Sequence, residues 1–432
     1  MDSTGPILRA RIEEAGYPGG FSVRNVSFDL DEGEVLLVAG RSGSGKTTLL
    51  RAVTQTIWRA GGYLRGSVEL GGRALDPASA SRLIAYVPQE PWFSVIGHTV
   101  WAEFCLAARY FGAPCERAPL EAAGLGALAD DPTFSLSAGQ LQRLLVAEGL
   151  WSGARVLAMD EPLVYLDRHA RRGVVEAVGK LAREGIAALV VDHMPSAWSP
   201  LRPRLLLLDG GRVKYHGEWA EAFEDRDPEV PARGPRAAGG ASSLEARGIW
   251  FRYPGGDYVL RGIDFSASFG ELVAVVGPNG SGKTTLLKVL SGILSPQRGR
   301  VVRRAPAIYV PENPVLYFSA PTPAEELATA SSRSGASPGE IVERLGLGKL
   351  LDRPLAKLSS GERRRVALAS AMLLGARILL LDEPTGGLDH STALELADLL
   401  VELVREGRTI VASTHDERLM RVADRIFEVA AG

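Results

Sequence analysis

The chain has 432 residues, which at roughly 100 to 200 residues per domain corresponds to two or three domains, each able to bury its own core. Hydrophobic residues make up 46% and charged residues 23% of the chain, as in ordinary globular proteins, so disorder is expected in linkers only. The formal net charge of -2 argues against a nucleic-acid binder that relies on neutralising many phosphates.

The first residues contain no basic stretch followed by an apolar run, so no secretory signal is expected there. No segment approaches roughly 18 consecutive apolar residues, the length that crosses a bilayer as a helix. The two cysteines, Cys105 and Cys115, form neither a CxxC pair nor a cluster with histidine, so no disulfide scaffold, iron–sulfur cluster or zinc site is expected. These observations predict a protein of a reducing compartment that is neither exported nor membrane-spanning.

Alternating strands are predicted over residues 21–30, followed by a buried strand over 34–39. The sequence GRSGSGKTT then occupies residues 40–48 and leads into a predicted helix. In the pattern GxxxxGK[ST], backbone N–H groups of a glycine-rich loop and of the helix N-terminus point at phosphate oxygens. We therefore expect Lys46 to reach the β- and γ-phosphates of a nucleotide and the Thr47 hydroxyl to ligate Mg²⁺.

Two further apolar strands of the first half are each followed by polar residues. The strand over 155–161 ends in Asp160 and Glu161 at the carboxyl edge of the sheet, where ligands of open α/β sheets bind. Asp160 is expected to hold Mg²⁺ through water, and Glu161 to polarise the attacking water. The strand over 188–191 precedes His193. The alternative, that the two acids only cap the next helix, is disfavoured by the phosphate loop upstream.

Residues 225–243 are rich in Pro, Gly, Ala and Arg and lack apolar periodicity, which predicts a flexible linker. The motifs that precede this linker return after it in the same order. GRSGSGKTT returns as GPNGSGKTT at 277–285, LSAGQ at 136–140 as LSSGE at 358–362, and DEP at 160–162 as DEP at 382–384. Two α/β domains with mainly parallel sheets are therefore predicted, over residues 1–224 and 244–432.

The order of these motifs resembles that of the ATP-binding cassette (ABC) ATPases over nearly all of both copies. The resemblance implies, in each domain, a mainly parallel sheet, an antiparallel β subdomain and a helical subdomain that begins at the LSxGx signature. It implies ATP and Mg²⁺ as cofactors and two ATP sites at a head-to-tail interface between the domains. In that arrangement each signature loop meets the γ-phosphate held by the other domain.

The resemblance also assigns roles by position. The catalytic residues are the acid after each Mg²⁺-holding aspartate and the switch histidine: Glu161, His193, Glu383 and His415. The Mg²⁺ ligands are Thr47, Gln89, Asp160, Thr284 and Asp382. The remaining residues expected around ATP are, in each copy, an adenine-stacking tyrosine, residues of the phosphate loop and residues of the signature. The second copy adds the residue at its Gln position. These residues are Tyr17, Gly40, Gly43, Gly45, Lys46, Thr48, Ser137, Gly139, Gln140, Tyr253, Gly277, Gly280, Gly282, Lys283, Thr285, Glu312, Ser359, Gly361 and Glu362. Asp167 and Asp389 match the acid of the D-loop.

A narrower resemblance begins at residue 89. The sequence QEP at 89–91, a short helical segment, TV at 99–100 and then Glu103 are similar to the layout in the energy-coupling factor (ECF) ATPases. The second copy has ENP at 312–314, Thr322 and Glu326. The resemblance implies the motor of an importer for a vitamin or a transition-metal ion, peripheral at the cytoplasmic face of the cell membrane. Its implied partners are an integral membrane coupling subunit and a separate substrate-binding membrane subunit, with no nucleic acid.

Apolar residues after the Gln position are the candidates for a groove that grips the coupling subunit: Trp92, Phe93, Val95, Ile96, Val315, Leu316, Tyr317 and Phe318. The alternative for these apolar residues is packing in the protein core. The alternative for Tyr17 and Tyr253 is a position in a surface turn. Glu312 stands where glutamine is usual, so hydrolysis at the second site is expected to be slower unless an arginine neutralises it. Two other functions stay open: a translation-linked or regulatory ABC ATPase without a transporter, and the ATPase of a sugar importer.

Overall fold

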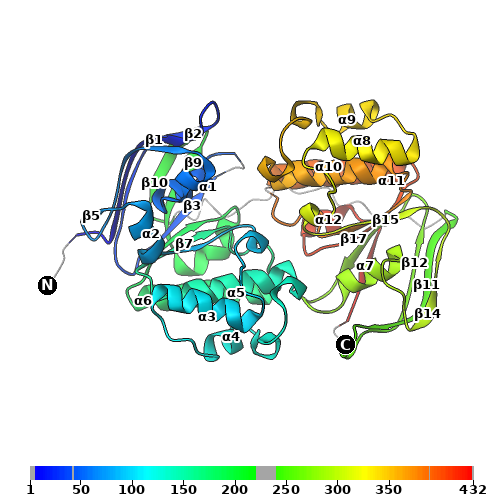
Figure 1. Ribbon diagram of the computed structural model, residues 1–432, viewed down its shortest axis with the longest axis horizontal. Coiled ribbons are helices and arrows are strands. Elements are labelled where there is room, and N and C mark those ends of the chain that lie inside the picture. The colour runs from blue at the N-terminus through cyan, green and yellow to red at the C-terminus, as the bar shows by residue number, and fades with distance from the viewer. Residues whose placement is uncertain (1–4, 41–42, 220–239, 389, 431–432) are drawn as a thin grey trace. The chain divides into compact units, whose positions relative to one another are not determined.

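The computed structural model describes residues 5–40, 43–219, 240–388 and 390–430 (Figure 1). The chain divides into two compact units, Met1–Asp227 and Pro228–Gly432. Most of the linker predicted over 225–243 lies outside the described residues. Its predicted end is too late, because strand β11 (Ser242–Arg252) begins inside it and buries Ser243, whose hydroxyl donates to the Ala267 carbonyl at 3.0 Å.

Unit 1 contains an antiparallel sheet in the order β2-β1-β4-β5. In β1, Leu8, Ala10 and Ile12 are buried while Arg9 is exposed, which is the period-two alternation of a sheet with one face on the core. The strands pair antiparallel throughout. Their bounds are β1 Leu8–Gly16, β2 Ser22–Leu30, β4 Tyr63–Leu70 and β5 Arg73–Ala74.

The second sheet of unit 1 is six-stranded, in the order β10-β9-β3-β8-β7-β6. Only the edge pair β10 and β9 is antiparallel. Strands β3, β7 and β8 are buried at every residue, as expected for a parallel sheet covered on both faces. The bounds are β3 Val35–Ala39, β6 Ile84–Val87, β7 Val156–Asp160, β8 Ala187–Val191, β9 Arg204–Asp209 and β10 Arg212–Gly217.

Helices cover this sheet and also form a separate layer in unit 1, where α3, α4 and α5 lie together (Figure 1). That layer has its own core, which includes Phe104 and Leu144. The helices are α1 Lys46–Val53, α2 Pro77–Leu83, α3 Val100–Phe111, α4 Ala118–Ala122, α5 Ala138–Trp151 and α6 Arg168–Arg183. Short 3-10 helices are η1 Thr56–Ala60, η2 Pro91–Phe93, η3 Gly126–Leu128, η4 Thr133–Ser135 and η5 Pro195–Leu201.

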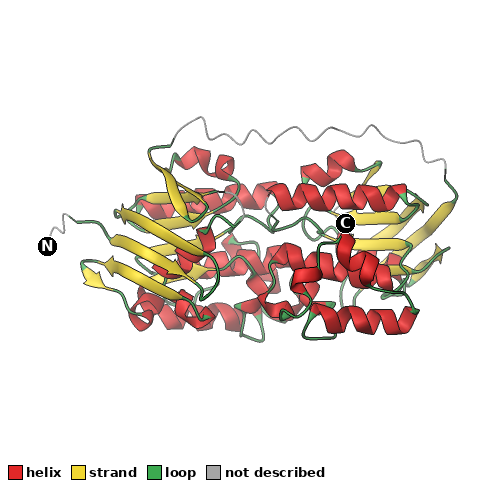
Figure 2. Cartoon of the chain, turned by 90° about the horizontal axis from the view of Figure 1, so that it is seen from above, coloured by secondary structure: helices red, strands yellow, loops and turns green. Residues whose placement is uncertain are grey.

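Unit 2 repeats the plan with a three-stranded antiparallel sheet, β12-β11-β14, and a five-stranded parallel sheet, β15-β16-β17-β13-β18. Figure 2 shows the strands as yellow arrows and the helices of each unit in red. The remaining strands are β12 Tyr258–Ser268, β13 Leu272–Val276, β14 Arg298–Arg303, β15 Ala307–Val310, β16 Ile378–Asp382, β17 Thr409–Ser413 and β18 Arg425–Glu428. The helices are α7 Lys283–Ser291, α8 Pro323–Ser334, α9 Gly339–Arg344, α10 Ser360–Leu373, α11 His390–Arg405, α12 Glu417–Val422, η7 Pro314–Leu316, η8 Gly348–Leu350 and η9 Leu355–Lys357.

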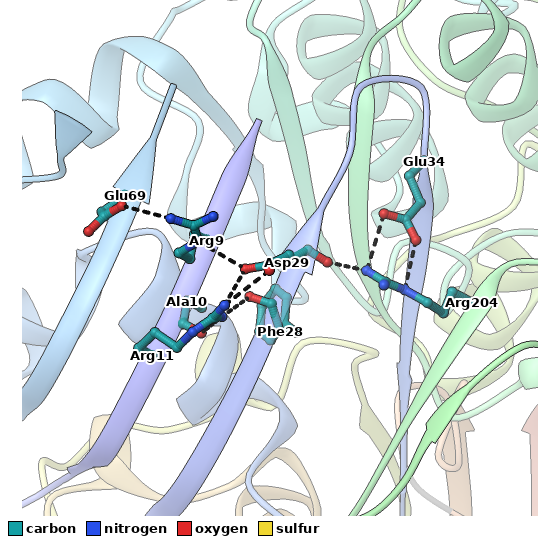
Figure 3. Close-up of polar contacts among 8 residues, drawn as sticks. All are labelled: Arg9, Ala10, Arg11, Phe28, Asp29, Glu34, Glu69 and Arg204. Atoms are coloured by element: carbon teal, nitrogen blue, oxygen red, sulfur yellow. Dashed lines mark hydrogen bonds and ion pairs between the residues drawn. The ribbon is translucent and has the colours of Figure 1, made fainter. Parts of the chain in front are cut away.

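An arginine joins the two sheets of each unit. In unit 1, Arg204 of β9 pairs with Glu34 at 2.7 Å and donates to the carbonyl of Asp29 in β2, while Arg9 and Arg11 of β1 pair with the Asp29 carboxylate (Figure 3). In unit 2, Arg425 of β18 donates to Glu271 at 2.9 Å and to the carbonyl of Ser266. Both arginines thereby fix the strand that leads into the glycine-rich loop.

The sequence led us to expect no disulfide scaffold, but Cys105 of α3 is paired with Cys115 in a disulfide, with the two Cα atoms 5.1 Å apart. α3 ends at Phe111, and Gly112 takes a left-handed conformation (φ 78) that reverses the chain. This reversal brings Cys115 back beside the helix, which the spacing of two cysteines in the sequence does not reveal.

Within the described ranges, no helix combines the length and the apolar character that crossing a bilayer requires.

Candidate active sites

Glycines give each loop a backbone path that other residues resist. A Cβ at Gly40 would collide with the carbonyl oxygen of Leu208 in β9, and one at Gly277 with that of Val429. Gly45 and Gly282, directly before α1 and α7, have φ values of 104 and 98. The remaining loop glycines with positive φ are Gly43 and Gly280. Each loop therefore turns tightly from a buried strand into a helix, as its sequence predicts.

The loops have the features that a phosphate chain needs. α1 and α7 begin at Lys46 and Lys283 with no acidic residue in the first turn, so their first N–H groups face no local carboxylate. The Lys46 ammonium folds back to the Gly40 carbonyl at 2.8 Å, and that of Lys283 to the Gly277 carbonyl at 2.8 Å. In the described part of the chain, the buried hydroxyls of Ser44 and Ser281 have no hydrogen-bond partner. These donors fit a triphosphate.

The candidate Mg²⁺ ligands of unit 1 meet at the end of β7. The Thr47 hydroxyl donates to the Asp160 carboxylate at 3.1 Å. Burial raises the pKa of Asp160 to about 7, with a further rise from the Glu161 carboxylate and an opposing effect from the Thr47 hydrogen bond. A divalent cation beside Asp160 would favour its charged form. In unit 2, Asp382 accepts from the Tyr309 hydroxyl at 2.9 Å and from the Ser413 hydroxyl, while Thr284 follows Lys283 in α7.

The glutamate after each aspartate adopts a left-handed conformation. The φ values are 47 for Glu161 and 43 for Glu383, which is unusual outside glycine and typical of functional sites. Glu161 contacts His193, with Nδ1 and Oε2 3.2 Å apart, and accepts from the Gln89 amide at 2.9 Å. Burial lowers the pKa of His193, but the Glu161 and Asp192 carboxylates together outweigh this and raise it above its ordinary value.

The second site brings together the equivalent residues with one difference. His415 Nε2 lies 3.7 Å from the Glu383 carboxylate and 3.0 Å from the Asn279 side-chain oxygen. Burial raises the pKa of Glu383 to about 8, and the Glu312 and Asp382 carboxylates raise it further, whereas Lys283 lowers it. At the position of Glu312, unit 1 has the neutral Gln89, which donates to its glutamate. The second site thus has one more carboxyl group than the first.

The tyrosines lie beside the phosphate-loop helices. The Tyr17 hydroxyl accepts from Arg51 of α1 at 3.1 Å, and the Tyr253 hydroxyl lies 3.3 Å from that of Thr285 in α7. The side chain of Tyr253 is 41% exposed, which leaves part of its ring open to a ligand. Thr48, the neighbour of Thr47 in α1, is half-buried.

Each signature begins a long helix through a capping box. Ser137 and Ser359 accept from the N–H of Gln140 and Glu362, whose side chains accept in return from the N–H of the serine. Gly361 is buried, and a Cβ there would press on the Thr392 side chain. Gly139 is also buried. The signature serines therefore sit at exposed helix N-termini, where backbone N–H groups can face an anion.

The loops after the Gln positions are anchored by a buried glutamate. Glu103 accepts from the N–H groups of Ile96, at 2.9 Å, and of Gly97. Glu326 accepts from the N–H groups of Ser319, at 2.8 Å, and of Ala320, at 3.2 Å. Ile96 is 80% exposed and Leu316 is 78% exposed. Glu103 and Glu326, the glutamates of the layout that is similar to that of the ECF ATPases, therefore hold loops that expose apolar side chains.

Trp92 does not match the interface prediction, and core packing describes it better. Its ring lies against Tyr165 with centroids 5.3 Å apart, and both pack with Ala138 and Val164. Val95 also packs partly against the core of unit 1. Val315, Tyr317 and Phe318 are half-buried. The side chain of Phe93 and the D-loop residue Asp389 lie outside the described residues.

Sequence reasoning missed the buried Arg364 of α10, whose guanidinium donates to the carbonyls of Glu383 and Gly386. Its place is five residues after Ser359, where the first copy has Gln142 after Ser137. Aligning the two copies could have revealed this difference, because one copy has an arginine and the other an amide side chain at the same buried position.

Two phosphate loops at strand–helix junctions, each facing an aspartate–glutamate pair, define a P-loop nucleotide hydrolase. A family model described as "ABC transporter" matches residues 23–164 and 260–386. An ABC transporter ATP-binding protein of Streptomyces avermitilis is 30% identical, over 95% of this chain and 90% of that protein. A protein named for HMP/thiamine import in Bacillus subtilis is 28% identical, over 92% of this chain and 84% of that protein.

Among solved structures, a model of ribosome-bound archaeal Pelota and ABCE1 is similar in fold, with a TM-score of 0.70, 24% identity, and coverage of 96% of this chain and 76% of that one. A structure of RNase-L inhibitor gives a TM-score of 0.60 at 22% identity, with coverage of 96% and 87%. The chain belongs to the ABC transporter family, with two tandem ABC ATPase domains. It is an ATPase that uses ATP with Mg²⁺.

Proposed function

We propose that this chain is the ATP-hydrolysing motor of an ECF-type importer for a vitamin or a transition-metal ion. The observation that carries the proposal is the exposure of Ile96 and Leu316 on loops that Glu103 and Glu326 anchor at equivalent positions. An apolar side chain held in water on a rigid loop suits a groove partner, because burying it removes apolar area from water. The relative named for HMP/thiamine import supports a vitamin-type substrate.

In this proposal the two domains close head-to-tail over two ATP molecules at the cytoplasmic face of the membrane. Lys46 and Lys283 bind the phosphates, and Thr47, Gln89, Asp160, Thr284 and Asp382 hold Mg²⁺, which neutralises charge on the β- and γ-phosphates. Glu161 and Glu383 orient and polarise the attacking water. His193 and His415, which lie beside those glutamates, would contact the γ-phosphate, and Ser137 and Ser359 would complete the opposite site.

The test uses Ile96→Glu combined with Leu316→Glu in the full chain. The double variant should lose co-purification with an integral membrane protein from detergent-solubilised membranes, while its ATPase activity without the partner stays near that of the parent. Ile293→Glu is the matched control, because Ile293 is also exposed, at 61%, but lies after α7 and outside both loops. It should keep the partner.

Two results would contradict the proposal. One is capture of the same membrane protein by the parent and the double variant alike. The other is sedimentation of the parent with ribosomes and with no membrane protein, which would favour the translation-linked alternative.

A further inference from the structure

Arg364 connects the signature helix of unit 2 to the backbone of the proposed catalytic glutamate. It lies in α10, is 6% exposed, and donates to the carbonyls of Glu383 and Gly386. The Glu383 carbonyl also accepts from the Gly386 N–H at 3.1 Å. Because Glu383 has a left-handed φ of 43, its peptide needs such external support to stay in place. A buried guanidinium with two carbonyl acceptors supplies that support.

The surroundings of Arg364 include both acidic segments of the second site. Together with Pro311, Asp382 and Pro384 it lines a small cavity. Pro311 directly precedes Glu312, and Pro384 directly follows Glu383. The Arg364 charge is therefore buried among segments that carry three carboxylates, and such charges are stable in a protein interior only when they are compensated.

Unit 1 has a neutral residue at the position equivalent to Arg364. Gln142 is 0% exposed, and among the described residues neither atom of its amide has a hydrogen-bond partner. Where unit 2 has Gly386 and Gly387 after its glutamate, unit 1 has Val164 and Tyr165, which pack with Ala138 and Trp92. The first copy thus combines Gln89 with Gln142, and the second combines Glu312 with Arg364.

We infer that Arg364 is a positioning residue of the second nucleotide site, which holds the Glu383 peptide and balances the additional carboxylate of Glu312. The inference rests on the proposed second ATP site. In this inference Glu312 and Arg364 act together. The second site therefore contains an acidic and a basic side chain where the first contains two amide side chains. Replacing Glu312 alone should then slow this site, because the Arg364 charge would no longer be balanced. This is the exception expected from the sequence, in which an arginine neutralises Glu312.

The experiment measures single-turnover ATP hydrolysis by the full chain in a Glu161→Gln background, which silences the first site. Arg364→Gln should lower the rate about 10-fold or more, with ATP affinity within about 2-fold, because misplacing a catalytic group lowers the rate more than binding. Glu312→Gln should also lower the rate. The combination Glu312→Gln with Arg364→Gln, which recreates the amide pair of unit 1, should restore it to within about 3-fold of the background.

Hydrogen exchange supplies a readout that does not depend on turnover. Amides 385–388 should exchange faster in Arg364→Gln than in the parent, and Lys349→Gln, an exposed charge loss in the same unit, should leave them unchanged. The inference is overturned by unchanged rate and exchange in Arg364→Gln, or by a loss of rate that the added Glu312→Gln fails to restore. Failure of the site itself is recognised separately, because Lys283→Ala would then leave ATP affinity unchanged.

Discussion

At the scale of single residues, the proposed sites combine groups that most positions of a fold do not tolerate. Glu161 and Glu383 have positive φ, and the lysines of both loops are buried with their ammonium groups on loop carbonyls. Left-handed backbone outside glycine costs of the order of 1–3 kcal/mol and persists only where the surroundings enforce it. We therefore propose that these residues serve nucleotide binding and hydrolysis rather than the stability of each unit.

Replacing Lys46 or Lys283 by alanine should weaken ATP binding at the affected site. A hydrogen bond to a charged group contributes roughly 1.5–3 kcal/mol, which corresponds to about 10- to 150-fold in affinity. Titration with a fluorescent ATP analogue measures the effect, and Lys214→Ala, an exposed lysine of β10, is the control. Unchanged affinity in both loop variants would refute the phosphate-loop assignment.

Glu148 predicts a pH dependence of stability in unit 1. Burial, followed by the Glu103 carboxylate, raises the pKa of Glu148 well above its ordinary value. Because the folded protein then binds a proton more tightly than the unfolded chain, this group favours folding at low pH. That advantage declines as pH rises from the unfolded pKa, near 4.5, through the raised folded value.

The melting temperature of Glu148→Gln should accordingly fall less steeply over this pH window than that of the parent. Glu116→Gln, an exposed glutamate after the Cys115 turn, should follow the parent curve. Parallel curves for Glu148→Gln and the parent would show that Glu148 titrates normally.

At the scale of elements, a buried carboxylate on α8 organises the loop before it. Glu326→Ala should leave the N–H groups of Ser319 and Ala320 without their acceptor. We expect their amide exchange to accelerate. The buried Ser370 hydroxyl also loses its acceptor, so the protein should lose about 1–3 kcal/mol of stability, the usual cost of an unsatisfied buried group. Exchange measured by mass spectrometry checks this, with the exposed neighbour Glu325→Ala as control. Equal exchange in both variants would mean that the loop is held by other contacts.

Strands with continuous apolar runs could be predicted from the sequence, whereas some contacts between elements could not. The strands over 34–39, 155–161 and 188–191 are confirmed as β3, β7 and β8, because short continuous apolar runs bounded by turn residues suit a parallel sheet covered on both faces. The Cys105–Cys115 pair was not predictable, since it depends on how the chain reverses after the end of α3. The sequence left core packing open for Trp92, and only the structure shows its contact with Tyr165.

At the scale of the whole molecule, head-to-tail pairing of the two domains predicts which pairs of substitutions damage the same ATP site. If the loop of one copy works with the signature of the other, Lys46→Ala and Ser359→Arg damage the same site. That double variant should keep roughly the steady-state ATPase rate of the weaker single variant, because the other site is untouched. Lys46→Ala with Ser137→Arg damages both sites and should abolish turnover. Equal rates in the two double variants would contradict this pairing.

The duplication, the α/β class, the phosphate loops and the acids at the strand ends were all predictable from the sequence, because they depend on local spacing and on periodic apolar residues. Which side chains act on those sites from a distance became visible in the folded chain. Gln89 and Glu161 are 72 residues apart in the chain, yet their side chains meet at 2.9 Å, and Arg364 reaches a carbonyl 19 residues further on. The first contact arises because β6 and β7 pair in parallel and end at the same sheet edge, and the second because α10 packs beside the end of β16. Neither leaves a periodic trace in the sequence.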